Sequence, residues 1–548
     1  MSLTPPGPPV PPPPSEPVGP QGEESRSGNP VLLGILVGLL VFALVGAGVG
    51  AWLLVSDSED PLDGGNAGPT FTPAPSSTAP LPETEPSLDR YYDQKLRWKR
   101  CGENRCATLK VPMDYTKPDG AEIGIAVLKV PATDEKNRVG SLVVNPGGPG
   151  GSGTEFAAAG PLQFGNALTR YFDIVGFDPR GVASSDPLAC LDTAGLDEVV
   201  AFDPDPDNPA EEASMDRLLG RFGQGCLDES GELARHMSTK EAARDMDVLR
   251  AALGESKLDY LGSSYGTFLG ATYADLFPKN VGRFVLDGAI DPSLSNEKLS
   301  LEQGRGFETA LRAYIKDCID AGGCYLGSTV DGGARKVRAF LDDLDAKPLQ
   351  TGESRELTEG LGMLGIWLPL YVKELWPDLT QALRSAMRTG DGSGLLGLAD
   401  RYTARGPKGF RDNSMEALYA VNCLDHNDYI ATKDVAARFP EFEKASPTFG
   451  RAFAYSLATC SNWPIRSGQR TVALHAKGAP PIVVIGTTRD PATPLVWAQA
   501  LAAQLDSGQL ITRDGDGHTG FGRGNSCVDD AVEKWLISGD RPQVDLKC

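Results

Sequence analysis

One serine-centred turn, GSSYG at residues 262–266, constrains the fold of this chain more than any other segment. Before it, residues 257–261 form a short strand-like run, and after it residues 267–276 have helical patterning. Upstream, Ser238 and Glu241 match a capping box at the start of a further helix. A GxSxG pattern between a strand and a helix is typical of a sharp turn that exposes its serine at the edge of a sheet. The order helix, strand, turn, helix therefore predicts an α/β domain with a mostly parallel sheet.

Ser264 is the residue that this turn would expose. A serine hydroxyl is a poor nucleophile at neutral pH and needs a neighbouring base to remove its proton. The helix that begins after Ser264 directs backbone N–H groups toward the same point, so the N–H of Tyr265 is a candidate oxyanion donor. The chain contains 64 glycines, so a plain Gly/Ser turn is the alternative. The other parts of a hydrolytic site decide between the two.

A candidate acid and a candidate base follow Ser264 in the order that catalytic triads on parallel sheets use. Residues 481–486 (PIVVIG) predict a buried strand, and Asp490 follows at its carboxyl end, where ligands bind in open α/β sheets. The alternative for Asp490 is an ordinary Asp-Pro turn. Residues 509–512 predict another strand, and His518 lies in the glycine-rich loop after it. Only four histidines occur, and we interpret the other three as solvated surface residues: His236, His426 and His475.

Residues 145–153 (NPGGPGGSG) follow a strand-like run at 141–144 and carry almost no side chains. Their backbone N–H groups can approach a substrate oxygen closely, and we assign Gly148 as the second oxyanion donor. A phosphate-binding loop is the alternative, but this segment lacks both the Lys-Ser/Thr ending of a P-loop and the GxGxxG spacing of a dinucleotide site. The loop therefore favours hydrolysis over phosphate binding.

Together these segments resemble the proline iminopeptidase and tripeptidyl aminopeptidase branch of the α/β hydrolases, and the secreted tripeptidyl aminopeptidases of actinobacteria in particular. The resemblance implies a catalytic triad of Ser264, Asp490 and His518, and hydrolysis of peptide bonds near free N-termini. It extends from near residue 90 to residue 548 and rests on six ordered motifs: NPGGPGGSG (145–153), FDPRGVASSDP (177–187), GSSYGTFLG (262–270), FVLDGAIDP (284–292), RDPATP (489–494) and DGHTG (516–520).

Asn145 departs from the pattern of the proline iminopeptidases, which have a histidine at this place in an HGGPG loop. The resemblance therefore does not imply strict specificity for an N-terminal proline. Asp178 and Arg180 belong to a post-strand loop that is common to the family. We interpret them as structural, in an ion pair or a turn.

Residues 1–89 differ in composition from the rest of the chain and predict three segments. Residues 1–30 hold eleven prolines and four charged groups, which predicts a disordered cytoplasmic tail. Residues 31–55 are uncharged throughout and about 37 Å long as a helix, enough to cross a hydrocarbon layer of roughly 30 Å. We expect a single transmembrane anchor with the N-terminus inside, and a cleaved secretory signal is the alternative. Residues 56–89 predict an extracytoplasmic linker.

The residues beyond the linker are too many for one sheet with its covering helices. We expect the first part of an α/β-hydrolase core at 90–292, a large helical cap at 293–479 over the carboxyl edge of the sheet, and the rest of the core at 480–548. A cap narrows the entrance to the site, which favours short peptides and chain ends as substrates.

All ten cysteines follow residue 55, and their even number predicts disulfides in an extracytoplasmic domain. The sequence leaves the connectivity open, although neighbours in order would close short loops: 101/106, 190/226, 318/324, 423/460 and 527/548. No CxxC occurs and histidines are few, so we expect no metal site and no cofactor.

The formal net charge of −21 disfavours nucleic acid and anionic lipid surfaces as partners. An exopeptidase needs a carboxylate for the substrate ammonium, and Asp425 and Asp428 are candidates, with solvated surface acids as the alternative. We expect a membrane-anchored serine aminopeptidase. The alternatives are a lipase or esterase with the same triad, and a catalytically silent surface protein that uses the scaffold for binding.

Overall fold

The computed structural model describes residues 71–74, 86–468 and 470–548. The predicted tail at 1–30, the predicted anchor at 31–55 and most of the predicted linker at 56–89 lie outside these residues. Within the described part of the chain, no helix combines the length and the apolar character that a membrane crossing needs.

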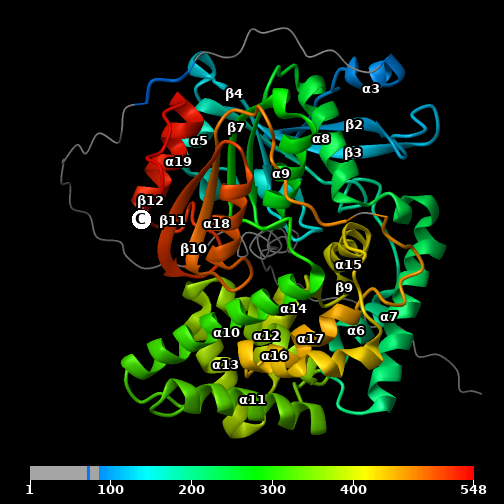
Figure 1. The fold of residues 1–548 in the computed structure, drawn as a ribbon, viewed down its shortest axis with the longest axis vertical. Coiled ribbons are helices and arrows are strands. Elements are labelled where there is room, and N and C mark those ends of the chain that lie inside the picture. The colour runs from blue at the N-terminus through cyan, green and yellow to red at the C-terminus, as the bar shows by residue number, and fades with distance from the viewer. Residues whose placement is uncertain (1–70, 75–85, 469) are drawn as a thin grey trace, which may run out of the picture. The chain divides into compact units, whose positions relative to one another are not determined.

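A ten-stranded sheet organises the domain (Figure 1). The pairs β1–β2, β2–β3 and β3–β5 are antiparallel, and every later pair across the sheet is parallel. The predicted mostly parallel α/β sheet is therefore confirmed. In their order across the sheet, the strands are Lys99–Cys101 (β1), Asn104–Pro112 (β2), Glu122–Val130 (β3), Phe172–Phe177 (β5), Gly140–Asn145 (β4), Leu258–Ser263 (β6), Val281–Asp287 (β7), Ile482–Arg489 (β10), Gly508–Asp516 (β11) and Leu546–Lys547 (β12).

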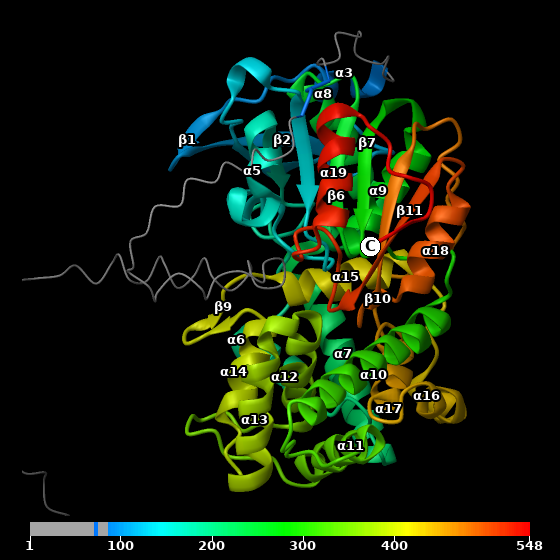
Figure 2. The same ribbon diagram turned by 90° about the vertical axis from the view of Figure 1, so that its left-hand side faces the viewer.

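Helices cover both faces of the sheet (Figure 2). β4 and β5 are buried along their whole length, as apolar parallel strands between two helical layers are. One face packs against Gly153–Ala158 (α4), Pro161–Tyr171 (α5) and Ser526–Ser538 (α19). The other face packs against Thr239–Leu253 (α8), Tyr265–Leu276 (α9) and Leu495–Gln504 (α18). Shorter helices at the sheet are Pro86–Leu88 (η1), Asp89–Tyr92 (α3), Glu135–Asn137 (η2), Gly231–Arg235 (η3) and Pro278–Asn280 (η4).

A helical cap lies beyond the carboxyl ends of the parallel strands (Figures 1 and 2). Apart from Ser414–Asp425, its helices share one hydrophobic cluster that is separate from the two clusters at the sheet. The cap elements are Asn296–Asp320 (α10), Val330–Ala346 (α11), Glu359–Tyr371 (α12), Lys373–Leu375 (η5), Trp376–Thr389 (α13), Ser393–Tyr402 (α14), Arg405–Gly406 (β8), Gly409–Phe410 (β9), Ser414–Asp425 (α15), Thr432–Arg438 (η6), Phe439–Ala445 (α16), Gly450–Tyr455 (α17) and Ser456–Ala458 (η7).

Two helices from the first part of the chain pack against both the cap and the core: Thr193–Ala201 (α6) and Pro209–Ser230 (α7). Val200 of α6 and Met215 and Leu219 of α7 are buried in the same cluster as the cap helices. The hydrophobic cluster of the cap therefore includes residues that precede 293, where the expected cap at 293–479 begins.

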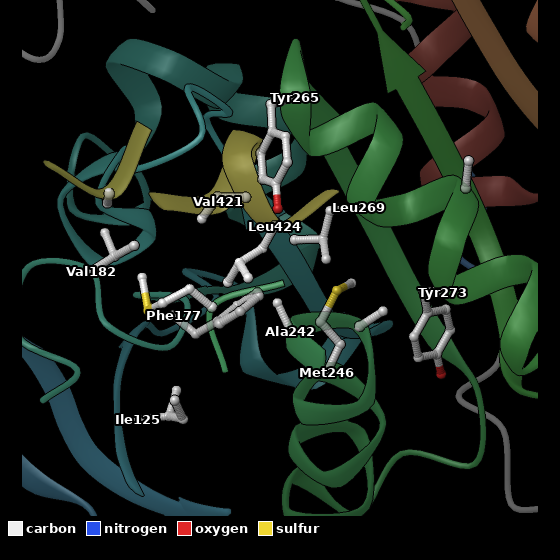
Figure 3. Packing of buried hydrophobic residues seen from close by; sticks show 14 of the residues in the cluster. Ile125, Phe177, Val182, Ala242, Met246, Tyr265, Leu269, Tyr273, Val421 and Leu424 are labelled. Atoms are coloured by element: carbon white, nitrogen blue, oxygen red, sulfur yellow. The ribbon is translucent and has the colours of Figure 1, made fainter. Parts of the chain in front are cut away.

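Helix α15 connects the cap to the core (Figure 3). Its Val421 and Leu424 are buried in one cluster with Tyr265 and Leu269 of α9, the helix that follows the serine turn. The cap is therefore anchored against the element that carries the candidate nucleophile.

All ten cysteines form disulfides, and each bridge joins one cysteine to the next cysteine along the chain. Five bridges indicate an extracytoplasmic location, because thiols stay reduced in the cytosol. The pairs are Cys101–Cys106, Cys190–Cys226, Cys318–Cys324, Cys423–Cys460 and Cys527–Cys548.

Candidate active site

Ser264 lies on a tight turn between the end of β6 and the start of α9. Its φ of 56° is in the left-handed region, and its N–H donates to the carbonyl of Asp287 at 2.8 Å. The flanking glycines are needed for space: a Cβ on Gly262 would lie 2.4 Å from the carbonyl oxygen of Gly266. This is the geometry of a nucleophile elbow, which holds the serine hydroxyl clear of its own backbone.

Asp490 and His518 form a buried pair, with exposed fractions of 2% and 4%. Nδ1 of His518 is 2.9 Å from each carboxylate oxygen of Asp490. The same carboxylate accepts bonds from the N–H groups of Ala492 and Thr493 at 3.0 and 2.9 Å, and from the Thr493 hydroxyl at 3.0 Å. Asp490 therefore fixes the ring of His518 and is itself held in place by the turn that follows β10.

Nε2 of His518 is buried and has no hydrogen-bond partner among the described residues. Because Nδ1 faces the carboxylate of Asp490, the proton belongs on Nδ1 and Nε2 is left as an acceptor. His518 and Ser264 line one cavity. The structure thus gathers the three predicted triad residues from β6, β10 and β11 at the carboxyl edge of the sheet.

The loop that carries His518 is held from two directions. The N–H of His518 donates to the carbonyl of Tyr371, the last residue of α12, at 2.8 Å, and the two rings meet edge to face at 5.3 Å. Beyond His518, the carboxylate of Asp287 accepts the N–H groups of Gly520 and Phe521 at 2.8 and 2.9 Å. Burial raises the pKa of Asp287 to about 6.

Sequence reasoning missed Tyr371, Asp287 and Thr493 as supports of the triad. The sequence could have indicated Thr493, since this residue lies three positions after the predicted acid in a tight turn. No sequence pattern could have indicated Tyr371, because it lies far from the triad in the sequence, on a cap helix.

The glycine-rich loop after β4 lies directly against the elbow. Gly147 and Gly148 have φ values of 95° and 111°, and a Cβ on Gly147 would lie 2.8 Å from Cβ of Ser264 and 2.9 Å from the nitrogen of Tyr265. The N–H of Gly147 donates to the side chain of Asn145 at 2.9 Å. The N–H of Gly148 donates to no acceptor among the described residues, and Gly148 lines the cavity at Ser264.

Two cavities meet at Ser264. The first, of about 170 Å³, also contains His518 and has an apolar wall: Phe156, Leu261, Leu368, Met415, Leu418 and Phe521. The second, of about 250 Å³, has several polar groups in its wall: Asp291, Gln303, Asn422 and His426. A substrate bound at Ser264 therefore has access to one apolar compartment and to a second compartment with more polar groups.

Neither Asp425 nor Asp428 lines these cavities. The carboxylate of Asp425 is buried against Thr239, whose N–H donates to it at 2.9 Å, and burial raises the pKa of Asp425 to about 7. Asp428 is exposed and accepts the N–H of Asn296 at the start of α10 at 2.7 Å. The acidic residue that does line the second cavity is Asp291.

Asp178 and Arg180 lie outside both cavities and are buried. Asp178 accepts the hydroxyl of Ser152 at 2.7 Å, at the start of α4. Arg180 pairs with Asp245 at 2.7 Å, so the ion pair in this loop is formed with α8 instead of with Asp178.

A mostly parallel sheet, a nucleophile elbow and a buried His–Asp pair at its carboxyl edge define a serine hydrolase of the α/β-hydrolase fold. Residues 446–548 match the family model described as "TAP-like protein". The chain belongs to this TAP-like family of α/β hydrolases.

Three relatives are similar over most of their length. Serine protease Hip1 of Mycobacterium tuberculosis is 37% identical over 481 residues, covering 83% of this chain and 91% of the relative. Carboxylesterase B of the same species is 36% identical over 500 residues, with 88% and 94% covered. Tripeptidyl aminopeptidase of Streptomyces lividans is 32% identical over 475 residues, with 83% and 86% covered. The relatives include both peptidases and an esterase. Membership of the family therefore establishes hydrolysis but does not determine whether the bond that is cleaved is a peptide or an ester.

Proposed function

We propose that this protein is an extracytoplasmic serine aminopeptidase that cleaves peptide bonds near free N-termini. The observation that carries the proposal is Asp291 in the wall of the second cavity, which Ser264 also lines. We also propose that residues 31–55 anchor the enzyme in the membrane as a single span, with the catalytic domain outside.

The chemistry follows from the residues at the elbow. His518 Nε2 removes the proton of Ser264 as Oγ attacks the peptide carbonyl. The resulting oxyanion accepts hydrogen bonds from the N–H groups of Gly148 and Tyr265. Asp490 stabilises the imidazolium that forms. His518 then protonates the leaving amine, and water attacks the acyl-enzyme with His518 again as the base.

Asp291 is suited to binding the substrate ammonium. It is 6% exposed, and one of its oxygens, Oδ1, accepts from Ser293 N–H, the Ser293 hydroxyl and Gln504 at 2.9, 2.7 and 2.6 Å. These bonds fix the carboxylate and leave Oδ2 without a partner among the described residues. We therefore assign amine binding to Asp291 in place of Asp425 and Asp428.

The test compares peptide substrates with free and acetylated N-termini. Acetylation removes the positive charge and leaves Asp291 unpaired, so kcat/KM should fall by roughly 30-fold to several thousandfold. Asp291→Asn should lose this preference by slowing only the free-amine substrates. Asp428→Asn, an acidic residue near the same junction, should keep it. Equal rates on free and acetylated peptides would remove the aminopeptidase assignment.

An esterase is the second candidate, favoured by the apolar wall of the first cavity and by the 36% identical carboxylesterase. Short-chain chromogenic esters, assayed beside the peptides, separate the two. Rapid ester turnover without peptide cleavage would select the esterase.

A further inference from the structure

A group of carboxylates lies in the cap, at the opposite end of α12 from His518. One carboxylate oxygen from each of Asp203, Asp345 and Glu359 lies within 4.8 Å of the others. Asp203 is in the connection between α6 and α7, Asp345 is in the last turn of α11, and Glu359 is the first residue of α12. The segments are packed closely, since a Cβ on Gly360 would lie 2.3 Å from the carbonyl oxygen of Phe202.

Glu359 provides an independent indication of a ligand. Its side chain is 2% exposed, and Oε1 is held by the guanidinium of Arg338. Oε2 is buried and receives no hydrogen bond from a donor among the described residues, and the carboxylate of Asp205 lies beside Glu359. A buried carboxylate oxygen without a donor is unfavourable, so this oxygen requires either a proton or a cation.

The charges that face the group are predominantly negative. Arg338 is shared between Glu359 and Asp205, which it contacts at 3.1 Å. Arg451 lines the adjoining cavity of about 610 Å³ but is paired with Glu443 at 2.7 Å. The same cavity is also lined by acidic residues: Asp205, Asp207, Asp342, Asp345 and Glu359.

We propose that Asp203, Asp345 and Glu359 bind a calcium ion. The ligands are carboxylate oxygens without histidine or cysteine, which is the donor set of a hard cation. The cavity beside Asp345 and Glu359 has room for the waters that complete a coordination shell. The connection supplies acids at alternate positions, Asp203-x-Asp205-x-Asp207, as calcium-binding loops do. The expectation of no metal site was based on cysteine and histidine patterns and does not apply to oxygen ligands.

The ion would join three segments that no disulfide connects. It would also fasten the first residue of α12, whose last residue, Tyr371, contacts His518 about 18 Å away at 1.5 Å per residue. Calcium binding is therefore expected to stabilise the cap and, through α12, the support of the catalytic histidine.

The experiment uses the full-length chain, purified in detergent and stripped of metal with EGTA. Calcium chloride is titrated by calorimetry, and thermal melting is recorded with and without saturating calcium. We expect saturable binding of one ion with a Kd of roughly 10⁻⁴–10⁻³ M, as in extracellular calcium modules, and a higher melting temperature with calcium.

Two variants and a control make the test specific. Asp345→Asn and Glu359→Gln should each weaken calcium binding by about tenfold or more, since each removes one charged ligand. Asp345 makes no ion pair among the described residues, so Asp345→Asn should melt without calcium at or above the wild-type temperature. Asp343→Asn, on the same helix and outside the group, should bind calcium normally.

Two results would overturn the proposal. One is the absence of saturable calcium binding by the wild type, with stabilisation only at lower pH, because the carboxylates would then hold a shared proton. The other is wild-type calcium affinity in both Asp345→Asn and Glu359→Gln.

Discussion

Ser264 has a backbone conformation that side chains rarely adopt, with φ of 56° and ψ of −127°. Such a conformation costs on the order of 1–3 kcal/mol and persists only where the surrounding structure fixes it. Here the N–H of Ser264 is held by Asp287 in β7, and the carbonyl of Ser264 accepts the Thr267 hydroxyl at 2.6 Å. The neighbouring strand and the first turn of α9 therefore impose the geometry that catalysis needs.

Ser264→Ala should keep the wild-type melting temperature and reduce kcat/KM by on the order of 10⁴-fold or more, because only binding and oxyanion stabilisation remain. Peptide hydrolysis and circular dichroism measure the two quantities. Thr272→Ala removes a hydroxyl from the same helix that makes no hydrogen bond among the described residues, and it should be fully active. Near wild-type turnover by Ser264→Ala would refute the assignment of the nucleophile.

Gly147→Ala should reduce kcat by roughly 10²–10³-fold, comparable to the loss of an oxyanion donor. Its Cβ would lie 2.5 Å from the carbonyl oxygen of Ser263, so either the loop or the elbow must shift. Gly231→Ala is the matched control, since Gly231 also has a positive φ but no atom lies within 4 Å of its Cβ position. Gly231→Ala should lose some stability and keep its kcat. Equal kcat values for the two variants would show that the close approach at Gly147 is unimportant.

At the scale of elements, the sequence predicts helix ends and strand starts well, because nearby residues determine them. Ser238 caps α8 through the N–H of Glu241, and Gly254 ends the helix with φ of 80°, as the sequence predicts. β6 begins at Leu258, one residue from the predicted start of that strand. Caps, glycine stops and short apolar runs act within a few residues, so a single sequence reveals them.

The contacts between elements could not be predicted in the same way. Helices α6 and α7 pack against the cap as well as the core, although they precede α8 in the chain. An amphipathic pattern indicates that one face of a helix is buried but does not indicate which layer covers that face. Asp291 and Asp425 are both acidic and both near helix or strand ends, and only the packing of the cap places Asp291 in the cavity and Asp425 against Thr239.

Disulfides that close longer loops should contribute more to stability. Cys190 and Cys226 are buried and 36 residues apart, whereas Cys101 and Cys106 are five residues apart on the outermost strands of the sheet. Replacing the first pair by alanine should cost roughly 2–5 kcal/mol, and replacing the second pair should cost less. Melting curves of the two double variants give the comparison. A larger loss for the 101–106 pair would contradict the loop-closure argument.

For the molecule as a whole, buried acids make stability depend on pH. Burial raises the folded-state pKa values of Asp259 and Asp287 to about 6 and those of Asp203 and Asp425 to about 7. Between about pH 4 and 7 the folded state therefore binds more protons than the unfolded state, and the free energy of unfolding falls as pH rises. Other acids have lowered pKa values, such as Asp514, which accepts hydrogen bonds from Thr488 and Arg489. These acids affect the free energy of unfolding only below this pH range.

The calcium-free protein should consequently melt at a higher temperature at pH 5 than at pH 7.5. Scanning calorimetry across this range, in buffer with EGTA, measures the slope. Asp425→Asn should flatten it, because the amide keeps its place against Thr239 without an ionisation. A melting temperature that rises steadily from pH 5 to 7.5 would contradict the assignment of these acids as protonated in the folded state.

The order of the five disulfides has a consequence for how the protein is made. Each bridge joins one cysteine to the next along the chain, and the widest separation is 37 residues. A chain that crosses a membrane from its N-terminus presents its cysteines in this same order, so an oxidase that couples each newly arrived pair forms the native set. We therefore expect the native disulfides to form with an oxidant alone, without an isomerase.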